Sequence, residues 1–351
     1  MGASRVLITR VGGPEVLKVQ EFDPSPPGNG EIAVAVRAAG LNFADVFCRL
    51  GLYEAAPPIP FAPGFEVAGT IEAVGGGADP VSRTATVTRF QPGDRVLAVT
   101  RFGGYASRLN VPAALARPLP SGWSFEEGAA FPVVFLTAWH GLVTVGRLAA
   151  GETVVVQSAA GGVGTAACQI ARALGARVLG TVGSEAKRET ARAAGASEVI
   201  VSPTYDVWDE VARMASGIDL VFDAVGGRGL RRGLRALRPG GRLVTYGFAS
   251  MMPKGGRRNW PLLAWRWLRA PRFSPFELTF TNRTVAGFNL VHLFDRLELF
   301  EASFRRLEEL AARGLVRPWI GAVFPHTEAP QAQALLQSRR STGKVILTFP
   351  A

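Results

Sequence analysis

The first 130 residues carry short apolar runs that are separated by proline and glycine clusters. Such runs occur at residues 6–8, 31–36 and 68–74, and the segment 24–28 (Pro-Ser-Pro-Pro-Gly) separates the first two. Residues 91–96 combine a turn signal with the start of another apolar run. Short strands and turns of this kind predict a β-barrel-like domain.

From about residue 133 onward, apolar strands alternate with helical spacing. Strands are predicted at 153–157, 176–181, 220–223 and 242–246, and a helix is predicted at 163–174. This alternation predicts an α/β fold with a parallel sheet wound by right-handed crossovers. An amphipathic helix is expected at 294–313. The closing strand at 344–347 is expected to return to the first domain.

The composition is that of a globular protein with room for two domains. The chain has 351 residues, of which 48% are hydrophobic and 19% are charged. No apolar run reaches the roughly 18 residues that a spanning helix needs. The first ten residues show no positive segment followed by an apolar stretch and a cleavage site, so we expect a cytoplasmic protein.

Cysteine and histidine are scarce. Cys48 and Cys168 are the only cysteines, and His140, His292 and His326 are the only histidines. A structural zinc site of four thiolates cannot be built from two cysteines, and no disulfide framework is expected. His140 falls on a predicted helix, where a packed side chain is the more common role.

The net charge of +11 raises the question of nucleic-acid binding. Arginine carries nearly all of the positive charge, since lysine occurs only at positions 18, 187, 254 and 344. The arginines are dispersed along the chain, and no recognised nucleic-acid-binding motif accompanies them. We therefore expect no nucleic-acid partner.

The strongest chemical signal is the segment 159–164, Ala-Ala-Gly-Gly-Val-Gly. It follows a predicted strand and opens a predicted helix, which is the context that a dinucleotide-binding turn requires. Without a side chain at Gly161, backbone N–H groups can approach a pyrophosphate, and Gly164 lets the helix pack closely on the sheet. The predicted cofactor-binding residues of this turn are Ala160, Gly161, Gly162, Val163 and Gly164.

The end of the next strand indicates which cofactor is bound. An NAD enzyme usually has Asp or Glu there, which binds the ribose hydroxyls. Here Gly183 and Ser184 leave room for a 2′-phosphate, and Lys187 can neutralise its charge. NADPH (or NADP⁺) is therefore favoured. Glu185, just beyond the strand, is the observation that argues against this assignment.

Several further motifs occur in order along the whole chain. They are residues 39–45 (Ala-Gly-Leu-Asn-Phe-Ala-Asp), 51–53 (Gly-Leu-Tyr), 63–69 (Pro-Gly-Phe-Glu-Val-Ala-Gly), 223–227 (Asp-Ala-Val-Gly-Gly) and 341–344 (Ser-Thr-Gly-Lys). With the glycine-rich turn, they resemble the zinc-independent quinone oxidoreductase branch of the medium-chain dehydrogenase/reductase superfamily. Residues 244–247, a tryptophan-rich insert and residues 282–289 are similar to the vesicle amine transport protein homologues of that branch.

The resemblance implies a GroES-like β-barrel catalytic domain, built from residues 1–132 and 291–351, and a Rossmann domain with a doubly wound parallel sheet at 133–290. It also implies a homodimer that pairs Rossmann edge strands near residues 284–289, where an unpaired edge would be a liability. The implied cofactor-binding set adds Gly183, Ser184, Lys187, Val225, Gly247, Phe288, Asn289, Gly343 and Lys344.

Two departures from the wider superfamily matter for the chemistry. Zinc dehydrogenases use a cysteine near the position of Asn42 and a Gly-His-Glu motif, whereas Phe65 here replaces the ligand histidine. The resemblance therefore implies neither zinc nor another metal, and Glu66 is expected to be satisfied by backbone groups or an arginine. In many quinone oxidoreductases a tyrosine near position 202 stacks close to the adenosine phosphate. This chain has Ser202, and whether Tyr205 substitutes for that tyrosine stays open.

Without zinc as a Lewis acid, the substrate must already be electrophilic, which fits a quinone or an α,β-unsaturated carbonyl. The resemblance places Asn42 and Tyr53 in the substrate pocket and Thr137 close to the nicotinamide. Asn42 and Tyr53 would donate hydrogen bonds to the developing oxyanion, and either Tyr53 or water would supply the proton. Asp45 is expected to be a helix N-terminal carboxylate and no more.

Two alternatives stay open. One is an enone or alkenal double-bond reductase with little quinone activity, and the other is a nucleotide-binding or membrane-peripheral protein with a reductase fold and little turnover. The insert 251–280 bears on the second. It carries Trp260, Trp265 and Trp267 among Arg257, Arg258, Arg266, Arg269 and Arg272. A lid or a dimer surface is favoured over peripheral membrane contact, because such helices most often pack on their own protein.

Overall fold

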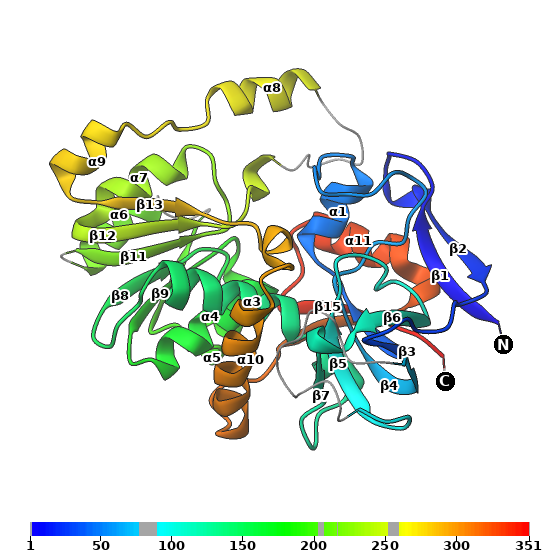
Figure 1. Cartoon of the computed structure of the whole chain (residues 1–351). Helices are drawn as coiled ribbons and strands as arrows, with labels where there is room; N and C mark the ends of the chain where they lie inside the picture. The colour runs from blue at the N-terminus through cyan, green and yellow to red at the C-terminus, as the bar shows by residue number, and fades with distance from the viewer. Residues whose placement is uncertain (1, 77–89, 203–206, 216, 252–259, 351) are drawn as a thin grey trace.

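The computed structural model describes residues 2–76, 90–202, 207–215, 217–251 and 260–350. Two lobes lie side by side in Figure 1, and both termini belong to the same lobe. The chain therefore leaves its first lobe, builds the second and comes back.

A six-stranded parallel sheet forms the middle of the second lobe. Its order is β10-β9-β8-β11-β12-β13, which is that of a doubly wound dinucleotide-binding sheet. All six residues of β11 are buried, as expected of a central strand that is covered on both faces. The strands are β8 (Thr153–Val156), β9 (Arg177–Val182), β10 (Glu198–Val201), β11 (Ile218–Asp223), β12 (Leu237–Thr245) and β13 (Thr284–Gly287).

Helices cover both faces of this sheet (Figure 1). On one face lie α3 (Pro132–Trp139), α4 (Gly162–Ala173) and α5 (Arg188–Ala193), and on the other lie α6 (Val207–Met214) and α7 (Gly229–Ala236). The π-helical segment η4 (His140–Val145) continues α3. These elements confirm the predicted α/β fold, the four strands expected in this region and the helix expected at 163–174.

The other lobe is built on a mostly antiparallel sheet with the path β14-β15-β3-β4-β5-β7. Its strands are β3 (Glu31–Gly40), β4 (Glu66–Val74), β5 (Arg95–Val99), β6 (Arg108–Pro112, on β3), β7 (Ala116–Pro118), β14 (Ile320–Pro325) and β15 (Lys344–Thr348). A hairpin of β1 (Ala3–Ile8) and β2 (Leu17–Phe22) lies beside it. Because Ile346 of β15 pairs with Gly40 of β3, the closing strand does return to the first lobe.

The remaining helices connect and flank the lobes. They are α1 (Phe43–Arg49), α2 (Phe125–Ala129), α8 (Trp260–Leu268), α9 (Pro275–Thr281), α10 (Leu297–Ala312) and α11 (Ala329–Gln337), with short helical turns η1 (Pro14–Val16), η3 (Ala113–Leu115), η5 (Glu185–Lys187), η6 (Ala249–Met251), η7 (Leu290–Leu293) and η8 (His326–Glu328). The amphipathic helix predicted at 294–313 is α10. Among the described residues, no helix is both long enough and apolar enough to cross a bilayer.

Candidate functional site

The glycine-rich turn joins β8 to α4, as predicted. Gly161 is the N-cap residue of α4, with φ −83° and ψ 174°. A methyl group at Gly164 would lie 2.1 Å from the Ser158 carbonyl oxygen, so only glycine lets the helix approach the strand this closely. A methyl group at Gly161 would meet only that oxygen, at 3.4 Å. The first turn of α4, which includes Gly162 and Val163, has N–H groups without intrahelical partners.

Residues 339–344, which we name the crossing segment, connect α11 to β15 and pass over this turn. The Gly343 N–H donates to the Ala160 carbonyl oxygen at 2.7 Å, and Gly343 forms a β-bridge with Gly161. Gly343 has φ +53°, and a methyl group there would lie 2.3 Å from the Trp319 carbonyl oxygen. This position therefore requires glycine.

The predicted 2′-phosphate residues lie at the end of β9. A methyl group at Gly183 would meet no atom within 4 Å, so the space beside it is open. Ser184 is followed by Glu185, whose carboxylate pairs with Arg188. Lys187 donates to the carbonyl oxygens of residues 339 and 341, both at 2.7 Å, and burial lowers its pKa.

Lys187 therefore ties the crossing segment to the second lobe, and one of its three N–H donors stays available for a phosphate. The Ser202 N–H donates to Val182 at 2.9 Å, which places residue 202 next to the end of β9. Tyr205 lies outside the described residues.

The loops after β11, β12 and β13 carry the residues that were predicted to bind the other half of the cofactor. Val225 donates its N–H to Asp223 at 3.1 Å, and a methyl group at Gly247 would lie 2.8 Å from the Ala224 carbonyl oxygen. These two loops therefore touch. The ring of Phe288 packs against His140, with ring centroids 4.8 Å apart. His140 is thus a packed residue, as expected.

Tyr53 and Asn289 meet across the two lobes. The Tyr53 hydroxyl donates to Asn289 Oδ1 at 3.2 Å, and the Tyr53 ring packs edge-on against Phe65 at 6.0 Å. Burial raises the pKa of Tyr53 to about 12. The phenol therefore keeps its proton over the physiological range and can act as a hydrogen-bond donor.

Asn42 belongs to a buried ionic network. Lys344 and Glu66 form an ion pair with side chains only 3% and 0% exposed. The Lys344 ammonium donates to Asn42 Oδ1 at 2.7 Å, and Asn42 Nδ2 donates to Glu66 at 3.0 Å and to the Gly40 carbonyl at 3.3 Å. The orientation of the Asn42 carboxamide is therefore set by a cation on one side and an anion on the other.

This network connects several elements. Glu66 was expected to be satisfied by backbone groups or an arginine, and it does accept from the Val133 backbone N–H at 2.7 Å. Its cationic partner is Lys344 rather than an arginine. Val133 lies one turn before Thr137 on α3, and Thr137 is buried there with 7% exposure. Asp45 caps α1 through the Asn42 N–H at 2.7 Å, as expected. It does more than was expected, because the same buried carboxylate also accepts from the Gly64 N–H at 2.8 Å and from the Tyr105 hydroxyl at 3.2 Å.

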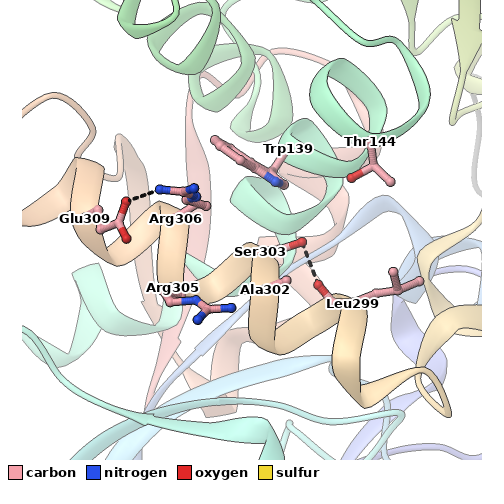
Figure 2. Close-up of a pocket in the computed structure, with 8 residues that line it drawn as sticks. All are labelled: Trp139, Thr144, Leu299, Ala302, Ser303, Arg305, Arg306 and Glu309. Atoms are coloured by element: carbon pink, nitrogen blue, oxygen red, sulfur yellow. Dashed lines mark hydrogen bonds and ion pairs between the residues drawn. The ribbon is translucent and has the colours of Figure 1, made fainter.

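A groove of about 580 Å³ lies elsewhere, between α10 and the end of α3 (Figure 2). It is lined by Trp139, Thr144, Leu299, Ala302, Ser303, Arg305, Arg306 and Glu309. None of the predicted site residues lines it. Figure 2 shows that its polar contacts, Arg306 with Glu309 and Ser303 with Leu299, stay within α10. The groove is therefore separate from the candidate site.

The two domains each match a known family. Residues 28–121 match the alcohol dehydrogenase GroES-like domain, and residues 162–309 match the family described as zinc-binding dehydrogenase. The chain is 36% identical over 346 residues to the human synaptic vesicle membrane protein VAT-1 homolog, which covers 97% of this chain and 85% of that protein. The chain belongs to the medium-chain dehydrogenase/reductase superfamily.

Within this superfamily it lies in the quinone oxidoreductase branch, near the VAT-1 homologues. A quinone oxidoreductase of Pseudomonas aeruginosa is 36% identical over 348 residues, 98% of this chain and 99% of that protein. The structure of Escherichia coli quinone oxidoreductase complexed with NADPH matches with a TM-score of 0.82 and 31% identity, over 99% of this chain and all of that one. The crystal structure of the human synaptic vesicle membrane protein VAT-1 homolog-like protein matches with a TM-score of 0.83 and 29% identity, over 100% of this chain and 99% of that one.

These matches confirm the predicted superfamily and the two-domain fold, and they make the chain a quinone oxidoreductase-like enzyme. Many medium-chain dehydrogenases bind zinc. Within the described ranges, no group of three or more His, Cys, Asp or Glu side chains is placed to hold a metal ion. Asn42, Glu66 and Lys344 form one bonded network, and Glu66 directly follows Phe65 in the sequence. Pairing of Glu66 with Lys344, 278 positions later, was the main feature that the sequence did not reveal.

Proposed function

We propose that this enzyme is an NADPH-dependent, zinc-independent reductase that transfers hydride to a quinone or an α,β-unsaturated carbonyl. The observation that carries the proposal is the open space beside Gly161, at the N-terminus of α4 and under the crossing segment. A pyrophosphate in that space would accept hydrogen bonds from the first turn of α4 and gain from the helix dipole.

The residues fit the larger NADPH molecule along its length. Gly183 leaves space for the adenosine ribose, and Lys187 has one donor left for a 2′-phosphate. Glu185, which could favour NADH, is neutralised by Arg188. Structures of related quinone oxidoreductases from E. coli and Thermus thermophilus are complexes with NADPH. At the other end, Val225, Gly247, Phe288 and Asn289 would contact the nicotinamide half.

When bound, NADPH supplies the hydride. The chain supplies hydrogen-bond donors for the charge that then develops on the carbonyl oxygen of the substrate. Tyr53 would turn its hydroxyl from Asn289 to that oxygen, and its pKa of about 12 keeps the donor protonated. Thr137 would border the nicotinamide from α3. Tyr53 or water would then provide the proton.

Asn42 would act as the second donor. Its weaker N–H contact, 3.3 Å to the Gly40 carbonyl, is the one that a substrate oxygen could replace. The Lys344 ammonium at 2.7 Å from Oδ1 withdraws electron density from the carboxamide and so strengthens the N–H as a donor. Lys344 would thus serve the nicotinamide end of the site through Asn42, while Gly343 holds the phosphate turn.

Two side chains support zinc independence. Phe65 offers no metal ligand, and the Glu66 carboxylate is already bonded to Lys344 and Val133.

The position of β13 supports an assembly of two copies. β13 lies at one edge of the Rossmann sheet, so pairing of two such edges would produce a homodimer. We further propose domain limits of 1–132 with 291–351 and 133–290, and a cytoplasmic location.

A steady-state assay tests the function. We expect NADPH oxidation with 9,10-phenanthrenequinone, at rates unchanged by prolonged dialysis against a zinc chelator. Tyr53→Phe should lower kcat by roughly a hundredfold to a thousandfold, the usual range for one lost oxyanion donor, with little change in the KM for NADPH. Faster turnover of a linear enone than of the quinone would assign the enzyme to the enone and alkenal reductases. No oxidation of NADPH with any electrophile would refute the proposal.

A further inference from the structure

Large exposed aromatic side chains gather on one part of the molecule. We name residues 260–281, which comprise α8, α9 and their connection, the aromatic arm. Trp267, Phe276 and Phe280 of this arm are 65%, 73% and 84% exposed, and Trp260, Trp265 and Leu268 are exposed as well. In Figure 1, α8 and α9 run along one edge of the molecule, outside the layers that cover the sheet.

Packing on its own protein does not account for the arm. Only Leu263 of α8 is buried, and no residue of α9 is. The Arg266 guanidinium donates to the Ser250 carbonyl at 2.7 Å, which fastens α8 to the body. Phe273 and Leu278 pack partly against the body. The remaining large apolar side chains of the arm are in contact with water, an arrangement that typically marks an interaction surface. A lid that buries these aromatics on this chain is therefore not what the described residues show, whereas a dimer contact stays a prediction.

The charges of the arm are almost all positive. Arg266, Arg269 and Arg272 lie among the aromatics, and the Arg269 guanidinium stacks over the Trp265 ring at 4.5 Å. Glu277 is the only acidic residue of the arm, and Arg231 of the body lies 3.4 Å from its carboxylate. Arginines interleaved with Trp and Phe are typical of segments that lie in a membrane interface.

Two occupants could cover such a surface, and charge separates them. A second copy that docked arm to arm would bring an equally positive segment, whereas the homodimer proposed above pairs the β13 edges. An anionic lipid surface would supply the opposite charge for the arginines and an apolar layer for the rings. We propose that the aromatic arm docks the enzyme on anionic phospholipid, with its aromatic side chains at the depth of the headgroups.

Vesicle co-sedimentation of the full chain tests this proposal. The vesicles are phosphatidylcholine alone or phosphatidylcholine mixed with phosphatidylglycerol. We expect binding to the mixed vesicles that weakens with salt, and a loss of roughly tenfold or more in the partition coefficient for Phe276→Ser combined with Phe280→Ser. Arg269→Ala should cost roughly fivefold, the value of one arginine near a charged surface.

Matched controls lie elsewhere on the surface. Val323→Ser on β14 removes an exposed apolar side chain, and Arg305→Ala on α10 removes an exposed arginine; both should bind like the unmodified chain. Quinone reductase activity without vesicles should be the same in all variants. The proposal is overturned if the chain ignores the mixed vesicles, or if it binds neutral vesicles equally well. It is also overturned if the arm variants lower the mass in analytical ultracentrifugation, because the arm would then cover a second copy.

Discussion

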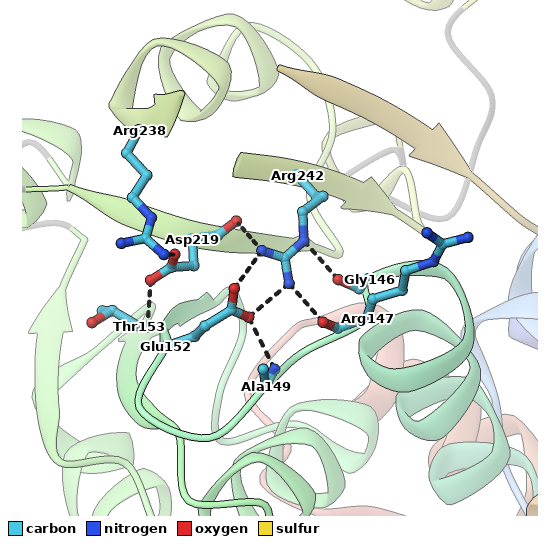
Figure 3. Close-up of polar contacts among 8 residues, drawn as sticks. All are labelled: Gly146, Arg147, Ala149, Glu152, Thr153, Asp219, Arg238 and Arg242. Carbon is cyan, nitrogen blue, oxygen red and sulfur yellow. Dashed lines mark hydrogen bonds and ion pairs between the residues drawn. The ribbon is translucent and has the colours of Figure 1, made fainter. Parts of the chain in front are cut away.

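The strand β11 begins and ends near a buried aspartate, but the two ends are built in opposite ways. At the amino end, Asp219 accepts from the Thr153 N–H at 2.8 Å and pairs with Arg238. Beside it, Arg242 binds both carboxylate oxygens of Glu152, at 2.8 and 2.7 Å (Figure 3). The same guanidinium donates to the carbonyl oxygens of residues 146, 147 and 219. Every donor of Arg242 is therefore used.

At the carboxyl end, no arginine or lysine of the described part of the chain pairs with Asp223. Asp223 accepts from the backbone N–H groups of Val225 and Gly226, at 3.1 and 2.6 Å, and burial raises its pKa to about 6. The glycine-rich turn after β8 lies at the same end and leaves space beside Gly161. At the amino end, which we name the closed end, the polar side chains bond one another and nearby carbonyl groups. At the carboxyl end, which we name the open end, space beside Gly161 stays uncovered. Four changes test this division, from the largest effect to the smallest.

Gly161→Leu should remove cofactor binding at the open end. Its backbone angles suit any residue and a Cβ meets only one atom at 3.4 Å, so the fold should survive while the side chain fills the pyrophosphate space. We expect NADPH affinity to fall by roughly a thousandfold, about 4 kcal/mol, with a Tm close to that of the unmodified chain. Fluorescence titration measures the affinity. Retained affinity would show that the turn does not hold the cofactor.

Arg242→Met, at the amino end of β11, should lower the stability of the fold and leave cofactor affinity unchanged. It leaves Glu152 without its cation and three carbonyl groups without a donor, which should cost about 3 kcal/mol of unfolding free energy in urea denaturation. Cofactor affinity of the folded fraction should be unchanged. Arg238→Met, at a more exposed guanidinium, is the matched control and should cost less. Equal costs would remove the special role of Arg242.

Lys187→Ala should weaken the binding of NADPH more than that of NADH. The loss of its remaining donor should weaken NADPH by roughly tenfold, about 1.4 kcal/mol. NADH should weaken less, because only the tie to the crossing segment is then lost. Glu185→Gln serves as the control, since Arg188 already neutralises that carboxylate. Equal losses for both nucleotides would take Lys187 out of 2′-phosphate recognition.

Asp223→Asn should change only the pH dependence of stability. The folded pKa of about 6 lies above the usual 3.8, so between these values the unfolded chain releases a proton that the folded chain keeps. This group therefore favours the folded state less and less as pH rises from about 4 to 6. The Tm of the unmodified chain, relative to Asp223→Asn, should fall across that window and then level off. Parallel Tm profiles would contradict the raised pKa.

The sequence predicted what local patterns control. The strand, turn and helix around Gly161 and Gly164 depend on residues close in sequence, and so does the cap of α1 at Asp45. Partners distant in the chain could not be predicted in the same way. From the sequence, Lys344 was interpreted as a cofactor ligand beside Gly343. Its pairing with Glu66 could not be predicted, because it depends on how β15 packs against β3 and β4.

The aromatic arm shows a second limit of sequence patterns. Tryptophans at 260, 265 and 267 indicate apolar surface, and a buried helix and an uncovered one have the same pattern. Only the fold shows that α8 and α9 leave these rings in solvent. The two carbonyl partners of Lys187 likewise depend on the path of residues 339–341, which no pattern near position 187 describes.

The crossing segment also has a consequence for biosynthesis. Gly161 and Asn42 are translated long before Gly343 and Lys344, which complete the turn and the ion pair. A nascent chain that has not yet released residues 339–348 from the ribosome holds a Glu66 carboxylate without its cation and a nucleotide groove without its cover. On the proposed function, capture of NADPH is therefore a late event, and a chain whose translation stops before residue 339 should have folded strands and no functioning site.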